Sequence, residues 1–328
     1  MIINRIKRNI FSKFSLCGKS FDEVQNRFIS DINDVTCLNE AKPDKGLLCL
    51  IYDDTPLIDN ETLSVLEALC LSTGKGFSIG NGFIAPIGYL GTLENPNIFS
   101  AQQFESSLYP DFLSIILHRI LNYHLKNGVI IFDTKSTFID FDVHLCSGCK
   151  IRPFTTLEGV CYVGKNSTIY EHSFLSNSHV GDNVIIKSSY VFDSRIGDNS
   201  TVGPFAYIRN GASVGNSCRI GDFVEIKASR LGSGVKCAHL TYVGDATIGE
   251  KTNVGCGTVF CNYDGEKKHR TNVGTNTFIG ANTNLIAPLS IGNNVFIAAG
   301  STVTDNVPEN SFVIARSKQT TKNQHISE

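Results

Sequence analysis

Aliphatic residues recur at every sixth position over much of the second half of the chain. Val202, Ile208, Val214, Ile220 and Ile226 form one uninterrupted run. After a five-residue step the series continues through Leu231, Cys237, Val243, Ile248, Val254 and Phe260, and then from Val273 through Ile279, Leu285, Ile291 and Ile297 to Val303. A less regular version runs upstream through Val163, Ile169, Leu175, Val180 and Ile186. This spacing matches neither the 3.6-residue period of an α-helix nor the alternation of a simple strand.

A period of six is typical of hexapeptide β-helices. Three hexapeptides form one triangular coil, and each aliphatic side chain points into a shared interior. Gly, Asn and Asp, which tolerate positive φ, stand where the chain turns a corner. The sequence therefore predicts a mainly β protein with a left-handed parallel β-helix over residues 128–316. A β-sandwich with frequent turns is the alternative, but so many repeats in register argue against it.

One interruption of the repeat predicts a loop. The step from Phe260 to Val273 is thirteen residues, so Cys261 to Asn272 must leave the coil. The segment, CNYDGEKKHRTN, is polar and cationic. Loops that project from a rigid scaffold are common sites of function.

Residues 1–127 lack this period and predict a small α/β segment. The apolar run Gly46–Tyr52 predicts a buried strand, and Asp59–Leu71 has helical spacing. Phe104–Asn127 predicts a connecting helix that begins near Pro110. The apolar stripe of this helix comprises Phe112, Ile115, Ile116, Ile120 and Leu121. The expected organisation is an α/β segment at 1–103, a connecting helix at 104–127, the β-helix at 128–316 and a polar tail at 317–328.

Composition removes several classes of function. A net charge of −2 provides no basic field for nucleic acid. No apolar run reaches the roughly 18–20 residues of a membrane span, and no signal peptide is recognisable. These features predict a cytoplasmic protein. The eleven cysteines are scattered, and only Cys146 and Cys149 stand close together, so we expect reduced thiols and no metal site.

Several long motifs carry a family resemblance. They are GPFAYIRNGA (Gly203–Ala212), GDFVEIKASRLG (Gly221–Gly232), HLTYVGDATIG (His239–Gly249), CNYDGEKKHRT (Cys261–Thr271) and IAPLSIG…IAAGSTVTDNVPENSFVIAR, which ends at Arg316. Together they resemble the acetyltransferase half of the bacterial bifunctional N-acetylglucosamine-1-phosphate uridyltransferase/glucosamine-1-phosphate N-acetyltransferase family. The resemblance covers about residues 127–319. It implies acetyl transfer from acetyl-CoA to the amine of glucosamine-1-phosphate, in a homotrimer with sites between neighbouring β-helices.

The resemblance also assigns the residues that carry the chemistry. The attacking amine must lose a proton, and a neutral histidine can accept one near neutral pH. His239 matches the family's general base. The other seven histidines are expected to be structural or on the surface, with the loop residue His269 left open.

The substrate-binding residues implied by the resemblance are polar or cationic, as a sugar phosphate requires. They are Arg209, Lys227, Tyr242, Asn253 and Lys268. Lys267 or Arg270 is the alternative to Lys268. Glu225 either adjusts the protonation of these groups or pairs with Lys227.

The resemblance places acetyl-CoA along the edge of the coil. The matching positions are Cys256, Asn262, Tyr263, Ala281, Ala299 and Arg316. Cys256 stands where the family commonly has Ala, and Ala281 where it often has Ser, and both changes leave the path of the pantetheine open. Direct transfer is expected. An acyl-carrying Cys256 is the alternative, disfavoured because no base is adjacent to it in sequence.

The uridyltransferase half of the family resembles this chain only faintly. Met1 to Ser20 contain no Gly-rich G-x-G-T-R-M loop. Leu48–Leu63 resembles the family's strand segment Y-G-D-x-P-L, in which Asp54 would match a metal-binding Asp and Asp53 replaces Gly. A lone Asp cannot hold Mg²⁺ and UTP. We expect a shortened, decayed remnant, with Mg²⁺ used only if uridyltransferase activity survives. The alternative to a remnant is a chance likeness. The alternatives to a dedicated acetyltransferase are a still bifunctional enzyme, acyl transfer to another sugar nucleotide, and an inactive trimeric scaffold.

Overall fold

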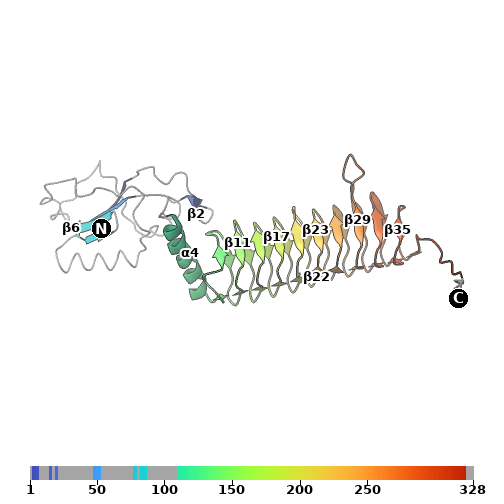
Figure 1. Cartoon of the computed structure of the whole chain (residues 1–328), viewed down its shortest axis with the longest axis horizontal. Coiled ribbons are helices and arrows are strands. Elements are labelled where there is room, and N and C mark those ends of the chain that lie inside the picture. The colour runs from blue at the N-terminus through green and yellow to red at the C-terminus, as the bar shows by residue number, and fades with distance from the viewer. Residues whose placement is uncertain are drawn as a thin grey trace, which may run out of the picture. The chain divides into compact units, whose positions relative to one another are not determined.

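The computed structural model describes residues 109–322 and six short strands before them, at 2–6, 15–16, 19–20, 47–52, 77–79 and 82–86. The chain divides into two compact units, 1–120 and 121–328. The larger one is dominated by the coils seen in Figure 1. Among the described residues, no helix is both long enough and apolar enough to cross a membrane.

The first unit contains a four-stranded sheet in the order β1-β4-β6-β5. Its strands are β1 (Ile2–Ile6), β4 (Leu47–Tyr52), β5 (Phe77–Ile79) and β6 (Gly82–Pro86), and a two-stranded sheet joins β2 (Ser15–Leu16) to β3 (Lys19–Ser20). The strand predicted at Gly46–Tyr52 is confirmed as β4, which pairs on both sides as a continuous apolar run allows. The predicted helix at Asp59–Leu71 and the segment with Asp54 lie outside the described residues, so the uridyltransferase remnant stays a prediction.

Helix α4 (Tyr109–Lys126) is the predicted connecting helix, and residues 104–108 lie outside the described part of the chain. Ile120, Leu121 and His124 are buried on its last turns. The helix ends at Lys126, and Gly128, two residues further on, has a φ of +83°. Glycine adopts this left-handed conformation without strain, and basic residues in the last turn complement the helix dipole.

The second unit is a parallel β-helix whose strands stack into three sheets, called here faces 1, 2 and 3. Face 1 contains β7 (Ile130–Ile131), β10 (Lys150–Ile151), β13 (Thr168–Ile169), β16 (Ile185–Ile186), β19 (Thr201–Val202), β22 (Arg219–Asp222), β25 (Lys236–His239), β28 (Asn253–Val254), β31 (Phe278–Ile279), β34 (Phe296–Ile297) and β36 (Phe312–Val313). Face 2 contains β8 (Phe138–Ile139), β11 (Thr156–Glu158), β14 (Phe174–Ser176), β17 (Tyr190–Phe192), β20 (Tyr207–Arg209), β23 (Glu225–Lys227), β26 (Tyr242–Gly244), β29 (Val259–Cys261), β32 (Asn284–Ile286) and β35 (Thr302–Val303). Face 3 contains β9 (His144–Leu145), β12 (Tyr162–Val163), β15 (His179–Val180), β18 (Arg195–Ile196), β21 (Ser213–Val214), β24 (Arg230–Leu231), β27 (Ala246–Ile248), β30 (Thr271–Val273) and β33 (Leu289–Ile291).

The core of the β-helix is the predicted set of aliphatic residues. Ile208, Ile220 and Ile226 are fully buried, and the other members of the downstream series are at most 4% exposed. Corner residues adopt positive φ, as at Asn199 (57°) and Asn294 (56°), because a short polar side chain tolerates this conformation. The predicted left-handed β-helix is therefore confirmed.

The predicted loop leaves the coil between β29 and β30, where the chain passes from face 2 to face 3. Figure 1 shows it projecting from the coils beside β29. The last strand, β36, ends at Val313, close to the predicted end of the β-helix at 316.

Candidate active site

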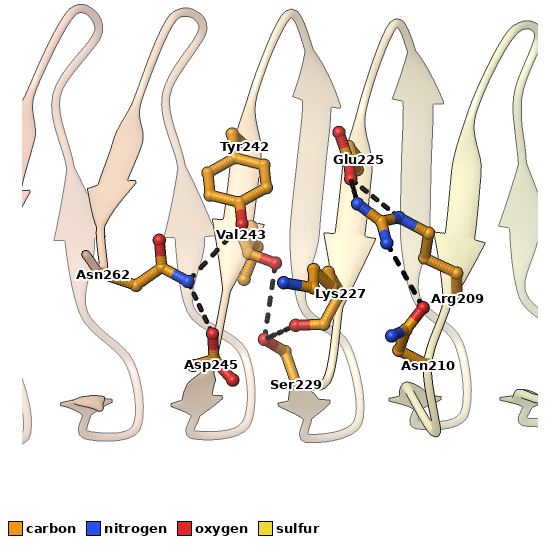
Figure 2. A network of polar contacts seen from close by, with 9 residues as sticks. All are labelled: Arg209, Asn210, Glu225, Lys227, Ser229, Tyr242, Val243, Asp245 and Asn262. Atoms are coloured by element: carbon orange, nitrogen blue, oxygen red, sulfur yellow. Dashed lines mark hydrogen bonds and ion pairs between the residues drawn. The ribbon is translucent and has the colours of Figure 1, made fainter. Parts of the chain in front are cut away.

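The basic residues predicted to bind a sugar phosphate lie side by side on face 2. Arg209 pairs in register with Lys227, and Lys227 with Gly244. Arg209 donates through Nε and Nη2 to Oε1 of Glu225, at 2.9 and 2.7 Å. Glu225 therefore pairs with Arg209 and not with Lys227, which corrects one of the two roles considered for it. Figure 2 shows this pair beside Lys227.

Lys268 brings a second ammonium group to Lys227 from the loop. The pKa of Lys268 is lowered, chiefly by its hydrogen bond to Lys227 and by the charge of that group. Two like charges this close repel each other unless an anion lies between them. A phosphate would relieve the repulsion, so the arrangement suits an anionic ligand.

Tyr242 and Asn262 form a polar cluster next to the lysines (Figure 2). Asn262 donates through Nδ2 to Oδ2 of Asp245 at 2.5 Å and to the Tyr242 hydroxyl at 3.4 Å. A Cβ at Gly244 would lie 2.7 Å from the Asn262 amide nitrogen, so only glycine leaves room for this contact. Asn262, predicted to contact acetyl-CoA, is buried and contacts the Tyr242 hydroxyl.

The loop is organised around Asp264. Oδ1 of Asp264 accepts hydrogen bonds from the backbone N–H groups of Glu266 and Lys267, each at 2.8 Å, and Oδ2 contacts Nε2 of His269 at 2.5 Å. These bonds, led by the one from Lys267, hold the pKa of Asp264 far below its usual range. His269, left open by the sequence, thus helps to shape the loop that carries Lys268.

His239 ends β25 at the corner between faces 1 and 2, and its side chain is 53% exposed. Its Nδ1 lies 2.6 Å from Oδ1 of Asp222, which occupies the paired position in the preceding coil. Asp222 is not among the site residues predicted from the sequence. A signal was present, because Asp222 and His239 each stand two residues after an interior residue, Ile220 and Cys237.

Three of the predicted acetyl-CoA positions continue this column down the same corner. The strand register extends from Asp222 and His239 to Cys256, Ala281 and Ala299 in successive coils. Glycines precede two of these residues, and a Cβ at Gly255 would lie 2.6 Å from the backbone nitrogen of Ala281. The column below His239 therefore carries only small side chains. Arg316 approaches its lower end, with Cδ 3.5 Å from the position of a Cβ on Gly300.

Two predicted residues lie apart from these groups. Asn253 is on face 1, in register with Lys236 and Phe278, whereas Lys227 and Tyr242 are on face 2. Tyr263 is exposed on the loop, where its hydroxyl donates to the Gly265 carbonyl at 2.5 Å. Among the described residues no group of three or more His, Cys, Asp or Glu side chains is arranged to hold a metal ion.

Comparison with known proteins identifies the relatives of this β-helix. The family model "Bacterial transferase hexapeptide (six repeats)" matches residues 193–228 and 270–305. A bifunctional protein GlmU of Clostridium botulinum (strain Kyoto / Type A2) is 49% identical over 209 residues, which are 63% of this chain and 46% of that protein. This segment is similar in sequence to the GlmU family. GlmU of Clostridium beijerinckii is 48% identical over 205 residues, 62% of this chain and 45% of the relative. The chain thus spans about half the length of the GlmU proteins it matches.

Solved structures of acyltransferases are more distant from the chain than these GlmU proteins. A Francisella novicida UDP-N-acetylglucosamine acyltransferase has a TM-score of 0.40 and 17% identity, and the match covers 54% of this chain and 62% of that one. The enzyme of the same name from Campylobacter jejuni has a TM-score of 0.37 and 17% identity, over 54% of this chain and 68% of that one.

Proposed function

We propose that the β-helix transfers an acetyl group from acetyl-CoA to the amine of glucosamine-1-phosphate, giving N-acetylglucosamine-1-phosphate for UDP-N-acetylglucosamine synthesis. The observation that carries this proposal is the column at the corner of faces 1 and 2. A histidine stands at its head, small residues lie below it, and the pair Lys227 and Lys268 lies on the adjoining face 2 and its loop. Neighbouring elements thus carry a general base, a path for the thioester and a site for the phosphate.

The reaction follows from these groups. The phosphate of the sugar binds between Lys227 and Lys268, and Arg209 stands beside them. The amine nitrogen attacks the thioester carbonyl carbon, while Nε2 of His239 takes a proton from that nitrogen. The tetrahedral intermediate collapses with cleavage of the C–S bond, and the CoA sulfur leaves with the proton held by His239. Transfer is direct, so Cys256 carries no acyl group.

Acetyl-CoA fits the column because its pantetheine arm needs a narrow apolar path. Cys256, Ala281 and Ala299 leave such a path along the corner, and Arg316 supplies a cation near its far end. The thioester would then lie next to His239.

A homotrimer would complete the site. Phe205, Phe223 and Leu240 form an exposed apolar ridge beside Asp222 and His239, each between 57% and 59% exposed. Each of the three also has a positive φ, which is uncommon for a bulky side chain. An exposed apolar strip of this kind is typical of a protein interface. Packing against a second copy would cover it and would offer Asn253, which lies on another face, to the neighbour's site.

The test is CoA release from acetyl-CoA and glucosamine-1-phosphate by the full chain and by His239→Ala. We expect turnover by the wild type and a loss of about 10²-fold or more in kcat for the variant, as for removal of a general base. His179→Ala, which removes an exposed histidine on face 3, serves as the control and should leave the rate unchanged. A folded, trimeric wild type without turnover would contradict the proposal and favour the scaffold.

A further inference from the structure

The contact between Asp222 and His239 joins two side chains from adjacent coils. Nδ1 of His239 and Oδ1 of Asp222 are 2.6 Å apart, the distance of a strong charge-assisted hydrogen bond. Both residues end their strands, β22 and β25, and they are register partners. The stacked backbones therefore fix the spacing of the two side chains, and the contact does not depend on a flexible loop.

The chemistry of the contact fixes the tautomer of the histidine. An ionised carboxylate only accepts hydrogen bonds, so the proton lies on Nδ1 and the lone pair on Nε2. The hydrogen bond from His239 is the largest cause that lowers the pKa of Asp222, which keeps this carboxylate ionised near neutral pH. The ring thus offers an unprotonated Nε2 on the side away from Asp222.

We propose that Asp222 is a positioning residue, which holds His239 in the tautomer that can accept a proton at Nε2 and stabilises the imidazolium formed when it does. This inference rests on the proposed acetyl transfer, in which the amine of glucosamine-1-phosphate is the group that gives its proton to His239. Asp222 itself touches no substrate in this scheme.

The charged groups around the pair show why the role of stabilising the imidazolium falls to Asp222. The other charged groups on the packed face 1 strands are Arg219 on β22 and Lys236 on β25, both cationic, while the paired residue on β28 is the neutral Asn253. Across the corner on face 2, Glu225 is engaged by Arg209. Of these groups, only the carboxylate of Asp222 is placed to favour a positive charge on His239.

A second histidine–carboxylate pair of the β-helix, His269 with Asp264, has a structural role and serves as a comparison. Asp264 binds two backbone N–H groups in addition to His269, so its carboxylate holds a turn together. No other side chain of the described residues hydrogen-bonds to the carboxylate of Asp222. Its removal should therefore leave the fold intact and act on His239 alone.

The experiment compares Asp222→Asn, Asp222→Ala and Asp222→Glu in the full chain. For the Asn and Ala variants we expect kcat to fall about 10-fold or more with little change in either KM, because the base is weakened and not the binding. Asp222→Glu, which keeps a carboxylate next to His239, should recover part of the lost kcat. Glu171→Gln, a remote carboxylate paired with Arg152, is the control and should behave as wild type.

Nitrogen-15 NMR of His239 gives a readout that does not depend on turnover. In the wild type, the neutral ring should carry its proton on Nδ1, and in Asp222→Ala this preference should disappear. A neutral wild-type ring protonated on Nε2, or a kcat unchanged in all three variants, would overturn the inference. If the wild type has no acetyltransferase activity, the proposed function fails, and the tautomer in the NMR spectrum still decides the pairing of Asp222 with His239.

Discussion

The corner between faces 1 and 2 is built differently in the upstream and downstream coils, although both halves share the same aliphatic interior. Upstream, the residues that follow the interior position of face 1 are long: Phe132, Arg152, Tyr170 and Lys187. They stack on one another, with the Arg152 guanidinium 4.4 Å from the Phe132 ring centre and the Lys187 ammonium 5.8 Å from that of Tyr170. Downstream, the same position holds Gly203, Gly221, Ala238, Gly255, Gly280 and Ala298.

This difference separates the shared scaffold from the proposed active site. Interior positions are set by packing and are alike in every coil. Exterior side chains are not part of the core, so a covered corner upstream and an open one downstream are compatible with one fold. The open corner is where His239 and the column of small residues lie. Because the interior is alike in every coil, it cannot set one coil apart from another. The position of a site in this solenoid therefore depends on which exterior residues occupy equivalent positions in successive coils.

The largest expected effect comes from filling the open corner at its backbone. In Gly255→Val, the new side chain would meet the backbone of Ala281 at 2.6 Å, and backbone cannot move aside as a side chain can. We expect a loss of about 1–3 kcal/mol in the free energy of unfolding in urea, together with loss of activity. Lys187→Val, at the equivalent upstream position, should change stability by no more than about 0.5 kcal/mol. Equal losses in the two variants would mean that the corners do not differ in this way.

The next effect concerns the proposed phosphate site on face 2. Lys227→Ala removes one of the two ammonium groups that face each other there, and a hydrogen bond to a charged group contributes about 1.5–3 kcal/mol. We expect the KM for glucosamine-1-phosphate to rise about 10- to 100-fold, with a much smaller change in the KM for acetyl-CoA. Lys267→Ala, an exposed neighbour in the loop, should leave both constants near their wild-type values. A matching rise for Lys267→Ala would assign the phosphate to the other lysine of the loop.

The sequence predicted the interior far better than the contacts of the site. Each interior residue follows from the period alone, so Ile208 and Ile279 could be placed without a structure. Exterior neighbours depend on coil length, which varies: Ile185 pairs with Thr201, 16 residues on, Thr201 with Arg219 at 18, and Arg219 with Lys236 at 17. These one- and two-residue deletions lie in corners, so a fixed period does not pair Asp222 with His239. Their pairing follows only when each is counted from its own interior neighbour, Ile220 or Cys237.

The partner of Glu225 illustrates the same limit on a smaller scale. Its neighbour along the strand is Lys227, and alternation places both side chains on the outside of face 2, which favoured a pair between them. The structure instead pairs Glu225 with Arg209 of the preceding coil. A long guanidinium reaches diagonally between adjacent strands and forms two bonds to one carboxylate oxygen, which an ammonium cannot do. Local sequence therefore identified the charged groups, and the stacking of coils determined their partners.

The smallest expected effect tests the column below His239 directly. Ala299→Leu adds bulk two coils below Cys256, far enough from His239 that the base and the anion site stay intact. If acetyl-CoA lies along this corner, the KM for acetyl-CoA should rise about 10-fold, since one misplaced methyl or methylene group in a close-fitting path costs about 1–3 kcal/mol. The KM for glucosamine-1-phosphate should stay the same. Ala299→Gly, which leaves the path open, should bind acetyl-CoA as the wild type does. A rise in the KM for glucosamine-1-phosphate instead of in the KM for acetyl-CoA would show that the open corner binds the sugar phosphate. The difference between the two corners would then explain how the sugar phosphate binds, and not how acetyl-CoA binds.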